Sequence, residues 1–183
     1  MKPQNNWRRG KWLICIRTAA SFLACLLAGL AFGEPAKAAP ATPTEALVII
    51  VNKANPLDNL TTEELRKYFR LEREQWPNGR KNTVLMLPPG TPEREAVLRQ
   101  IYQFDESEFS RHFLQATFTG QIHSAPKELA SAVNMRKFVF NVPGAIGYVR
   151  ASEVDDTVKV IRVDGLALTD KNYPFKIATP GIK

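Results

Sequence analysis

The stretch from Thr83 to Leu98 constrains the fold most, because it joins a strand pattern to a helix start through a very short turn. Its first five residues are apolar or β-branched, as in a buried strand, and Pro-Pro-Gly follows as a turn. Thr91 then suits a helix N-cap, and Pro92 suits the first helical position. A strand that runs through a tight turn into a helix predicts an α/β sheet with helices packed on its faces.

The turn itself has two interpretations. The start of a helix leaves backbone N–H groups free and its dipole favours negative charge, so a Gly turn before a helix is a geometry that binds oxyanions. The alternative is an ordinary strand-to-helix corner, which every α/β domain contains. Local pattern alone favours the corner, since isolated Gly-turn motifs often occur without a ligand.

Residues 1–38 have the features of a signal peptide. A basic segment containing Arg8 and Arg9 precedes the apolar run from Thr18 to Gly33, and an Ala-x-Ala cleavage signal ends at Ala38. Cleavage after Gly33 and retention as an uncleaved anchor are the alternatives. The apolar run of 16 residues is short of the ~20 that span a bilayer comfortably. We therefore predict a cleaved, exported protein located in the periplasm.

Removal of this leader changes the charge argument. The whole chain has 25 basic and 18 acidic residues and a net charge of +7. The leader contains six of the basic residues and one acidic residue, so the remainder has a net charge of only +2. Both cysteines, Cys15 and Cys25, also lie in the leader. The exported part is therefore expected to bind no nucleic acid and to fold without disulfides.

The remaining chain is predicted to form a flexible tether over residues 39–45 and one α/β domain over residues 46–183. Helix-start patterns in which a capping residue is followed three positions later by glutamate occur at Thr61 and Asp105. The further expected elements are strands at 46–52, 83–87, 145–149, 158–163 and 173–177, a helix from Pro92, and a helix over 126–141 with Leu129, Val133 and Phe140 inward.

No residue pattern indicates an enzyme, a metal site or a cofactor. His112 lies between two phenylalanines at helical spacing, which is typical of a packed or half-exposed histidine. His123 has no Cys or His partner at metal-ligand spacing. Neither a nucleophile elbow nor a carboxylate pair in a catalytic context is present. We expect a binding or interaction protein.

Four segments in their order along the chain resemble a known family. They are Ile49 to Phe69 followed by Trp76, Gly90 to Val97, Pro-Gly-Ala-Ile-Gly-Tyr-Val at 143–149, and Val158 to Gly165 with Tyr173-Pro174. Together they resemble the phosphate-binding proteins of ABC transporters, in the type II periplasmic binding protein superfamily. The resemblance implies a single periplasmic-binding-protein-like lobe, an α/β fold with a mixed sheet flanked by helices.

The resemblance also implies a ligand site, and the chain departs from the family there. The family's turn resembles Arg-x-x-Gly-Ser-Gly-Thr-Arg-Glu, from which Gly90, Thr91 and Arg94 are the ligand-binding candidates. Its leading arginine is replaced by Leu87. Glu93 places a negative charge where an anion would lie, and the proline that precedes it lacks an N–H donor.

Two functions follow from these observations. The first is an exported solute-binding protein for phosphate or another oxyanion, in phosphate transport or sensing. The second is an interaction module that retains the lobe without the anion site and contacts a membrane transporter or a periplasmic protein. The departures in the turn favour the second function, whereas Thr91, Arg94 and the helix dipole favour the first.

Overall fold

The computed structural model describes residues 44–178, and the structural findings below concern these residues. A six-stranded mixed sheet forms the centre, in the order β4-β3-β5-β1-β6 with β8 beside β1. β1 runs antiparallel to β5, β6 and β8, whereas β3 runs parallel to β4 and β5. The strands are β1 (Thr44–Val51), β3 (Thr83–Met86), β4 (Lys127–Glu128), β5 (Ala145–Arg150), β6 (Lys159–Val160) and β8 (Lys176–Ala178).

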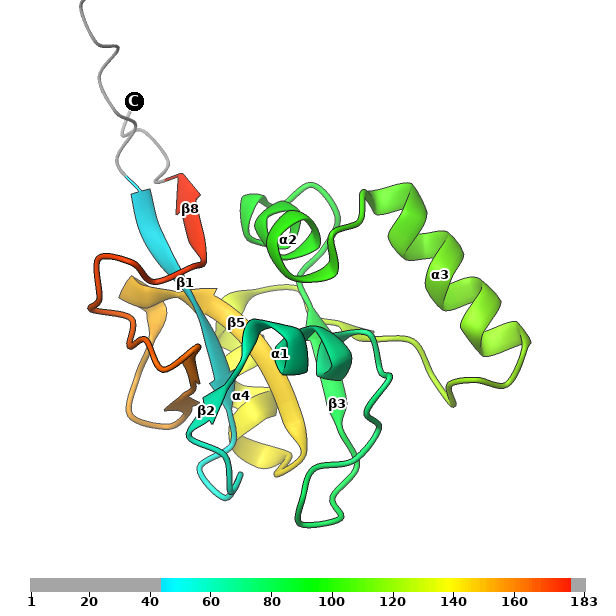
Figure 1. The fold of residues 1–183 in the computed structure, drawn as a ribbon, viewed down its shortest axis with the longest axis horizontal. Helices are drawn as coiled ribbons and strands as arrows, with labels where there is room; N and C mark the ends of the chain where they lie inside the picture. Colours follow the sequence, from blue (N-terminus) through cyan, green and yellow to red (C-terminus); the bar gives the residue numbers. More distant parts are fainter. Residues whose placement is uncertain (1–43, 179–183) are drawn as a thin grey trace, which may run out of the picture. The chain divides into compact units, whose positions relative to one another are not determined.

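Helices flank this sheet, and a short second sheet lies beside it (Figure 1). α4 packs against β1 and β5, whereas α2 packs against β5 and β8. The predicted mixed α/β sheet flanked by helices is confirmed. The helices are α1 (Thr62–Phe69), α2 (Pro92–Val97), the π-helix η1 (Leu98–Tyr102), α3 (Glu106–Phe118), α4 (Ala132–Asn141) and the 3₁₀ helix η2 (Ala151–Glu153); the second sheet pairs β2 (Asn59–Leu60) with β7 (Arg162–Val163).

β5 lies between two other strands and is buried along its whole length. Because successive side chains of a strand point to opposite faces, its residues serve two different layers. Gly147 faces α4, where a Cβ atom would lie 2.7 Å from the sulfur of Met135, so the glycine permits α4 to approach closely. Tyr148 points to the opposite face, and its hydroxyl oxygen accepts a hydrogen bond from the Leu87 N–H at 2.9 Å.

The turn before β5 requires a glycine for the same steric reason. A Cβ atom on Gly144 would lie 2.0 Å from the backbone oxygen of Lys81. The Gly144 carbonyl accepts hydrogen bonds from the Trp76 indole N–H and from the Thr83 N–H, both at 2.9 Å. The Pro-Gly turn thus fixes the amino end of β3. Trp76 is 2% exposed and stacks on Tyr68, so its role in the fold is packing.

Two helix starts follow their sequence signatures. Thr61 and Glu64 form a reciprocal capping box at α1, and Asp105 and Glu108 form another at α3. Both were predicted from the threonine- or aspartate-to-glutamate spacing. The buried residues of these two helices are Leu65, Tyr68 and Phe69 in α1, and Phe109, Phe113 and Ala116 in α3.

The helix expected over 126–141 is wrong in its start and in its inward face. Residues 127 and 128 form β4 beside β3, and α4 begins only after Ser131, whose side chain accepts from the Asn134 N–H. The residues that face the sheet also differ from the prediction. Met135 and Val139 are fully buried, whereas Val133 and Phe140 are 47% and 55% exposed; Leu129 is partly buried.

Strand boundaries also differ from the expectation. β1 begins at Thr44, two residues before the predicted start, because Thr44 and Glu45 pair with β8. The tether predicted over 39–45 therefore does not include these two residues. The last strand covers 176–178 rather than 173–177. The predicted signal peptide and the rest of the tether lie outside the described residues, within which no helix has the length and apolarity to cross a membrane.

Candidate functional site

The turn at the carboxyl end of β3 is held from two sides. Tyr148 receives the Leu87 N–H, and the Thr91 hydroxyl donates to the Pro88 carbonyl at 2.9 Å. Gly90 adopts φ +81°, which side chains rarely tolerate, and nothing lies within 4 Å of the position its Cβ would take. Gly90 is exposed and Thr91 is half-buried, so both candidates lie at the surface of the turn.

Arg94, the third candidate, points away from this surface into the protein. Its side chain is 5% exposed. Two of its nitrogens donate to the Glu106 carboxylate at 3.0 and 2.6 Å, and the third donates to the Leu87 carbonyl at 2.7 Å. Glu128 lies 3.4 Å from the same guanidinium, which also stacks over the Phe109 ring. The Arg94 guanidinium is present as predicted, but its hydrogen bonds and ion pairs link the end of β3 to α3 and β4.

A second arginine near the turn is also held in ion pairs. Arg150, at the end of β5, is bound to Glu93 at 2.5 Å and to Glu45 at 3.4 Å. The three side chains are 10%, 14% and 19% exposed, respectively, so this cluster is largely shielded from water. Glu93, expected to repel an anion at the helix start, thus has a cation of its own.

The surroundings of the turn change the pKa values of Glu45 and Tyr148. Burial opposes the charged form of Glu45, but hydrogen bonds from Ser152 and Arg150 outweigh it, and the pKa of Glu45 is lowered. On the other side of the turn, burial raises the pKa of the Tyr148 hydroxyl well above its ordinary value. Tyr148 is therefore a neutral support for the turn at physiological pH.

The start of α2 offers little to an anion. The helix has only six residues, and the Thr91 side chain makes no capping hydrogen bond. Pro92 has no N–H, and Glu93 and Glu95 add negative charge in the first turn. Helical geometry continues from α2 directly into η1, so the weakness of this helix start lies in its missing donor and its acidic residues rather than in its length.

Sequence reasoning did not find the ion-pair partners of the two arginines. Arg150 is separated from Glu93 by 57 residues and from Glu45 by 105. Glu106 follows the helix start predicted at Asp105 but was not itself singled out from the sequence. No local spacing signals such pairs, because they depend on which strands lie side by side in the sheet.

Of the two histidines, His112 packs against Phe104 and Phe113 on α3. His123 lies 3.3 Å from the Glu74 carboxylate, and its side chain is 76% exposed. Within residues 44–178, no three His, Cys, Asp or Glu side chains cluster as metal ligands do.

α3 also carries an exposed apolar pair. Leu114 and Phe118 are 73% and 90% exposed, and their spacing of four residues places them on one face of the helix. α3 projects from one side of the described domain in Figure 1, and its buried face packs on the neighbouring helix η1.

Comparison with solved structures identifies proteins of the same fold. An ABC-type phosphate transport receptor from Vibrio cholerae matches with TM-score 0.58 at 22% identity, over 76% of this chain and 59% of that one. A candidate phosphate ABC transporter substrate-binding protein from Clostridium perfringens, solved with bound phosphate, gives 0.60 at 20%, over 75% and 56%. PstS from Borrelia burgdorferi gives 0.58 at 14%, over 74% and 55%.

The likeness is one of fold, and it is partial in length. No protein-family model matches the chain. The chain spans less than two thirds of the length of each of the three solved proteins. It has the periplasmic-binding-protein-like α/β fold of the phosphate ABC transporter substrate-binding proteins.

Proposed function

We propose that this chain is an exported, periplasmic module of the substrate-binding-protein type that serves phosphate transport or sensing through contact with a protein partner. In this proposal the chain does not itself capture free phosphate. The observation that carries it is the pairing of both arginines near the turn. Arg94 is bound by Glu106 and Arg150 by Glu93, so neither guanidinium is left for a ligand.

Energetics support this view of the turn. An exposed helix N-terminus stabilises a bound anion by only about 0.3–1 kcal/mol. A micromolar complex requires about 8 kcal/mol. The difference would have to come from charge-assisted hydrogen bonds, and Leu87 stands where the family's turn has an arginine.

The partner is expected to be a membrane transporter or a periplasmic protein. Leu114 and Phe118 on α3 support this part of the proposal, because a highly exposed leucine and phenylalanine on one helix face are typical of protein contacts. A crosslinking amino acid at position 118 should trap the same protein repeatedly in cells. The same probe at exposed Lys171, on the segment before β8, is the matched control.

The second candidate is direct binding of phosphate or another oxyanion by Gly90, Thr91 and Arg94. Two observations favour it. Gly90 keeps the left-handed backbone of an open Gly turn, and the fold matches a protein solved with bound phosphate. For this function Arg94 would have to leave Glu106 when the anion enters.

A calorimetric titration with phosphate separates the two candidates. We expect no saturation of the wild-type protein at micromolar phosphate. The double variant Leu87→Arg with Glu93→Thr should bind measurably, and its binding should weaken with salt because exposed charge pairs are screened.

Micromolar binding by the wild-type protein that is lost in Arg94→Lys would establish the second candidate and exclude the first. Failure of the double variant to gain binding would show that the turn lacks the geometry of an anion site. Because Glu93→Thr and Arg94→Lys each alter a shielded ion pair, the control is a circular dichroism spectrum showing that each variant is folded at the temperature of the titration.

A further inference from the structure

We propose that Asn78 is a site of spontaneous deamidation, at which the folded protein converts an asparagine into aspartate and isoaspartate without an enzyme. Asn78 is the only asparagine of the chain that a glycine follows. Attack on the side-chain amide by the next backbone nitrogen is fastest before glycine, because glycine has no side chain to hinder it. Asn78 and Gly79 are both exposed, in the turn between Trp76 and the amino end of β3.

The Asn78 side chain is folded back over the peptide that follows it. Its amide oxygen accepts a hydrogen bond from the Arg80 N–H at 3.2 Å. This bond closes a small ring around Gly79 and keeps the amide carbon of Asn78 beside the Gly79 nitrogen, which favours the attack. The Arg80 N–H also points at the oxygen on which negative charge develops, so it stabilises the transition state.

One contact opposes the reaction. The Gly79 N–H donates to the Trp76 carbonyl at 2.8 Å, and the nitrogen must lose this proton before it can attack. The contact lies in an exposed turn, where local opening costs little free energy. Gly79 adopts φ +77°, and nothing lies within 4 Å of the position its Cβ would take, so its backbone can rotate without a clash. The contact therefore slows the reaction without preventing it.

The reaction needs only water and hydroxide. Hydroxide removes the proton of the Gly79 N–H, and the nitrogen forms a bond to the amide carbon of Asn78. The bond from that carbon to the amide nitrogen breaks, and the amide nitrogen takes a proton from water and leaves as ammonia. Water then opens the cyclic imide. Cleavage at the former side-chain carbonyl gives aspartate, and cleavage at the main-chain carbonyl gives isoaspartate.

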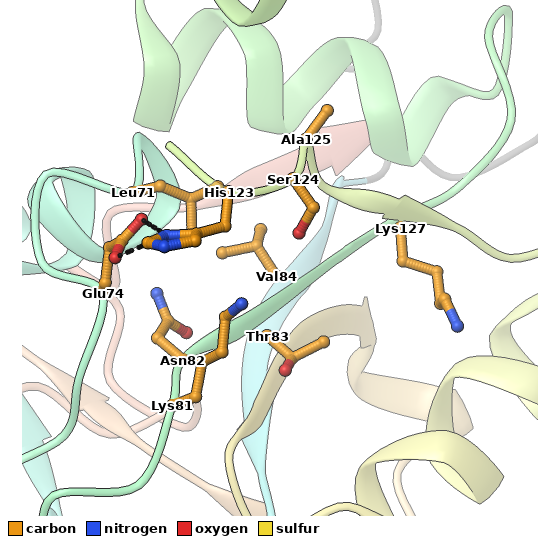
Figure 2. A pocket seen from close by; sticks show the side chains of 10 residues that line it. All are labelled: Leu71, Glu74, Lys81, Asn82, Thr83, Val84, His123, Ser124, Ala125 and Lys127. Atoms are coloured by element: carbon orange, nitrogen blue, oxygen red, sulfur yellow. Dashed lines mark hydrogen bonds and ion pairs between the residues drawn. The ribbon is translucent and has the colours of Figure 1, made fainter. Parts of the chain in front are cut away.

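Hydrogen bonds on both sides hold the turn at a fixed length. The Trp76 N–H donates to the Arg80 carbonyl at 2.9 Å. Farther out, the Asn82 N–H donates to the Glu74 carbonyl at 2.7 Å. Figure 2 shows where the turn ends: Lys81 and Asn82 line a cavity of about 290 Å³, and Glu74 lines it as well. The main chain between Glu74 and Asn82 therefore has little room for an added atom.

The two products fit this turn differently. Aspartate keeps the main chain, and its carboxylate can accept from the Arg80 N–H, so the turn gains a negative charge without a change of shape. Isoaspartate routes the main chain through the former side chain and lengthens it by a carbon atom. The hydrogen bonds across the turn then lose their register. Isoaspartate at position 78 therefore loosens the attachment of the amino end of β3.

The test is incubation of the full chain in a mildly alkaline buffer, with digestion and mass spectrometry at intervals. The peptide that contains Asn78 should gain the mass of an amide-to-acid conversion and should split into separate chromatographic forms for aspartate and isoaspartate. Conversion at Asn78 should be at least ~10-fold faster than at Asn141, an exposed asparagine that a valine follows. The rate should rise with pH, because hydroxide takes up the proton.

One variant and one condition locate the cause. Gly79→Asp adds a side chain next to the reacting amide and is among the residues that tolerate a left-handed backbone, so it should slow conversion at least ~10-fold in a folded protein. The wild-type chain unfolded in urea reports conversion without the turn. Conversion in urea but none in the folded protein would show that the Trp76 contact blocks the reaction and would overturn the proposal. Equal conversion at Asn78 and Asn141, or unaltered conversion in Gly79→Asp, would overturn it too.

Discussion

The charged side chains at the two ends of β3 differ in whether they form ion pairs. At its carboxyl end, Arg94 and Arg150 are buried and bound to carboxylates of the same chain. At its amino end, Lys81 is exposed and has no carboxylate partner among the described residues. Paired charges stabilise the fold and leave nothing for a ligand, whereas unpaired charges beside a cavity remain available. The charges at the carboxyl end of β3 therefore act within the fold.

Substitutions of the charged residues at the two ends of β3 are expected to differ in their effect on stability. Removal of one partner from a shielded ion pair leaves a buried charge, which is strongly destabilising. Removal of a solvated ammonium changes stability very little. Substitutions at the carboxyl end of β3 should therefore cost much more stability than substitutions at its amino end.

Arg150→Met should have the largest effect. It leaves the shielded carboxylates of Glu93 and Glu45 without a cation, so we expect a loss of about 3–5 kcal/mol in the free energy of unfolding. Urea denaturation followed by Trp76 fluorescence measures it. Adding Glu93→Gln to this variant should restore part of the loss. A loss below ~1 kcal/mol would mean that the cluster is hydrated.

Arg94→Met should destabilise somewhat less, by about 2–4 kcal/mol, because its partner carboxylates can recover water when the guanidinium is gone. The Leu87 carbonyl and the Phe109 ring still lose their contact. The same denaturation experiment applies, with Arg99→Met as the control, since Arg99 is exposed on the neighbouring helix. Equal stability of the two variants would contradict the structural role assigned to Arg94.

Acid should weaken the fold through carboxylates whose pKa values are lowered. Burial opposes ionisation of Glu45, but its hydrogen bonds to Ser152 and Arg150 prevail; hydrogen bonds from the backbone of the capping boxes lower the pKa values of Glu64 and Asp105. Groups of this kind stabilise the native state above their ordinary pKa, and the contribution is lost as pH falls through the lowered value.

The unfolding free energy, measured by urea titration, should therefore be level above the ordinary glutamate pKa of 4.5 and fall below it. The capping-box variant Glu64→Gln should show a smaller decline over this range than the wild-type protein. A free energy that rises on acidification would contradict the sign of these shifts.

Lys81→Met should have the smallest effect on stability, within about 0.5 kcal/mol of the wild-type protein. The side chain is exposed and makes no ion pair in the described part of the chain. Thermal unfolding of the variant and the wild-type protein measures the difference. A large loss of stability would place Lys81 with the arginines as a structural charge and remove the contrast between the two ends of β3.

Local patterns in the sequence determined the elements and much of the core. Capping residues such as Thr61 and Asp105 act within one helical turn, and the Pro-Gly turn before β5 acts through its own backbone, so their effects are encoded locally. The α/β sheet followed from the alternation of these elements, whereas its mixed strand directions were implied only by the family resemblance. The same local reasoning placed Gly90, Thr91 and Arg94 in one turn, which the structure retains.

Only the tertiary structure decided which way Arg94 points and what it binds. Glu106 and Glu128 come from α3 and β4, and the Arg150 cluster joins β1, α2 and β5. The start of α4 was mispredicted for a related reason: Lys127 and Glu128 pair with β3 instead of beginning the helix. Its inward face was also mispredicted, since Phe140 is exposed. Sequence spacing determines contacts within a turn or a helix, whereas contacts between strands far apart in the chain depend on sheet order and register.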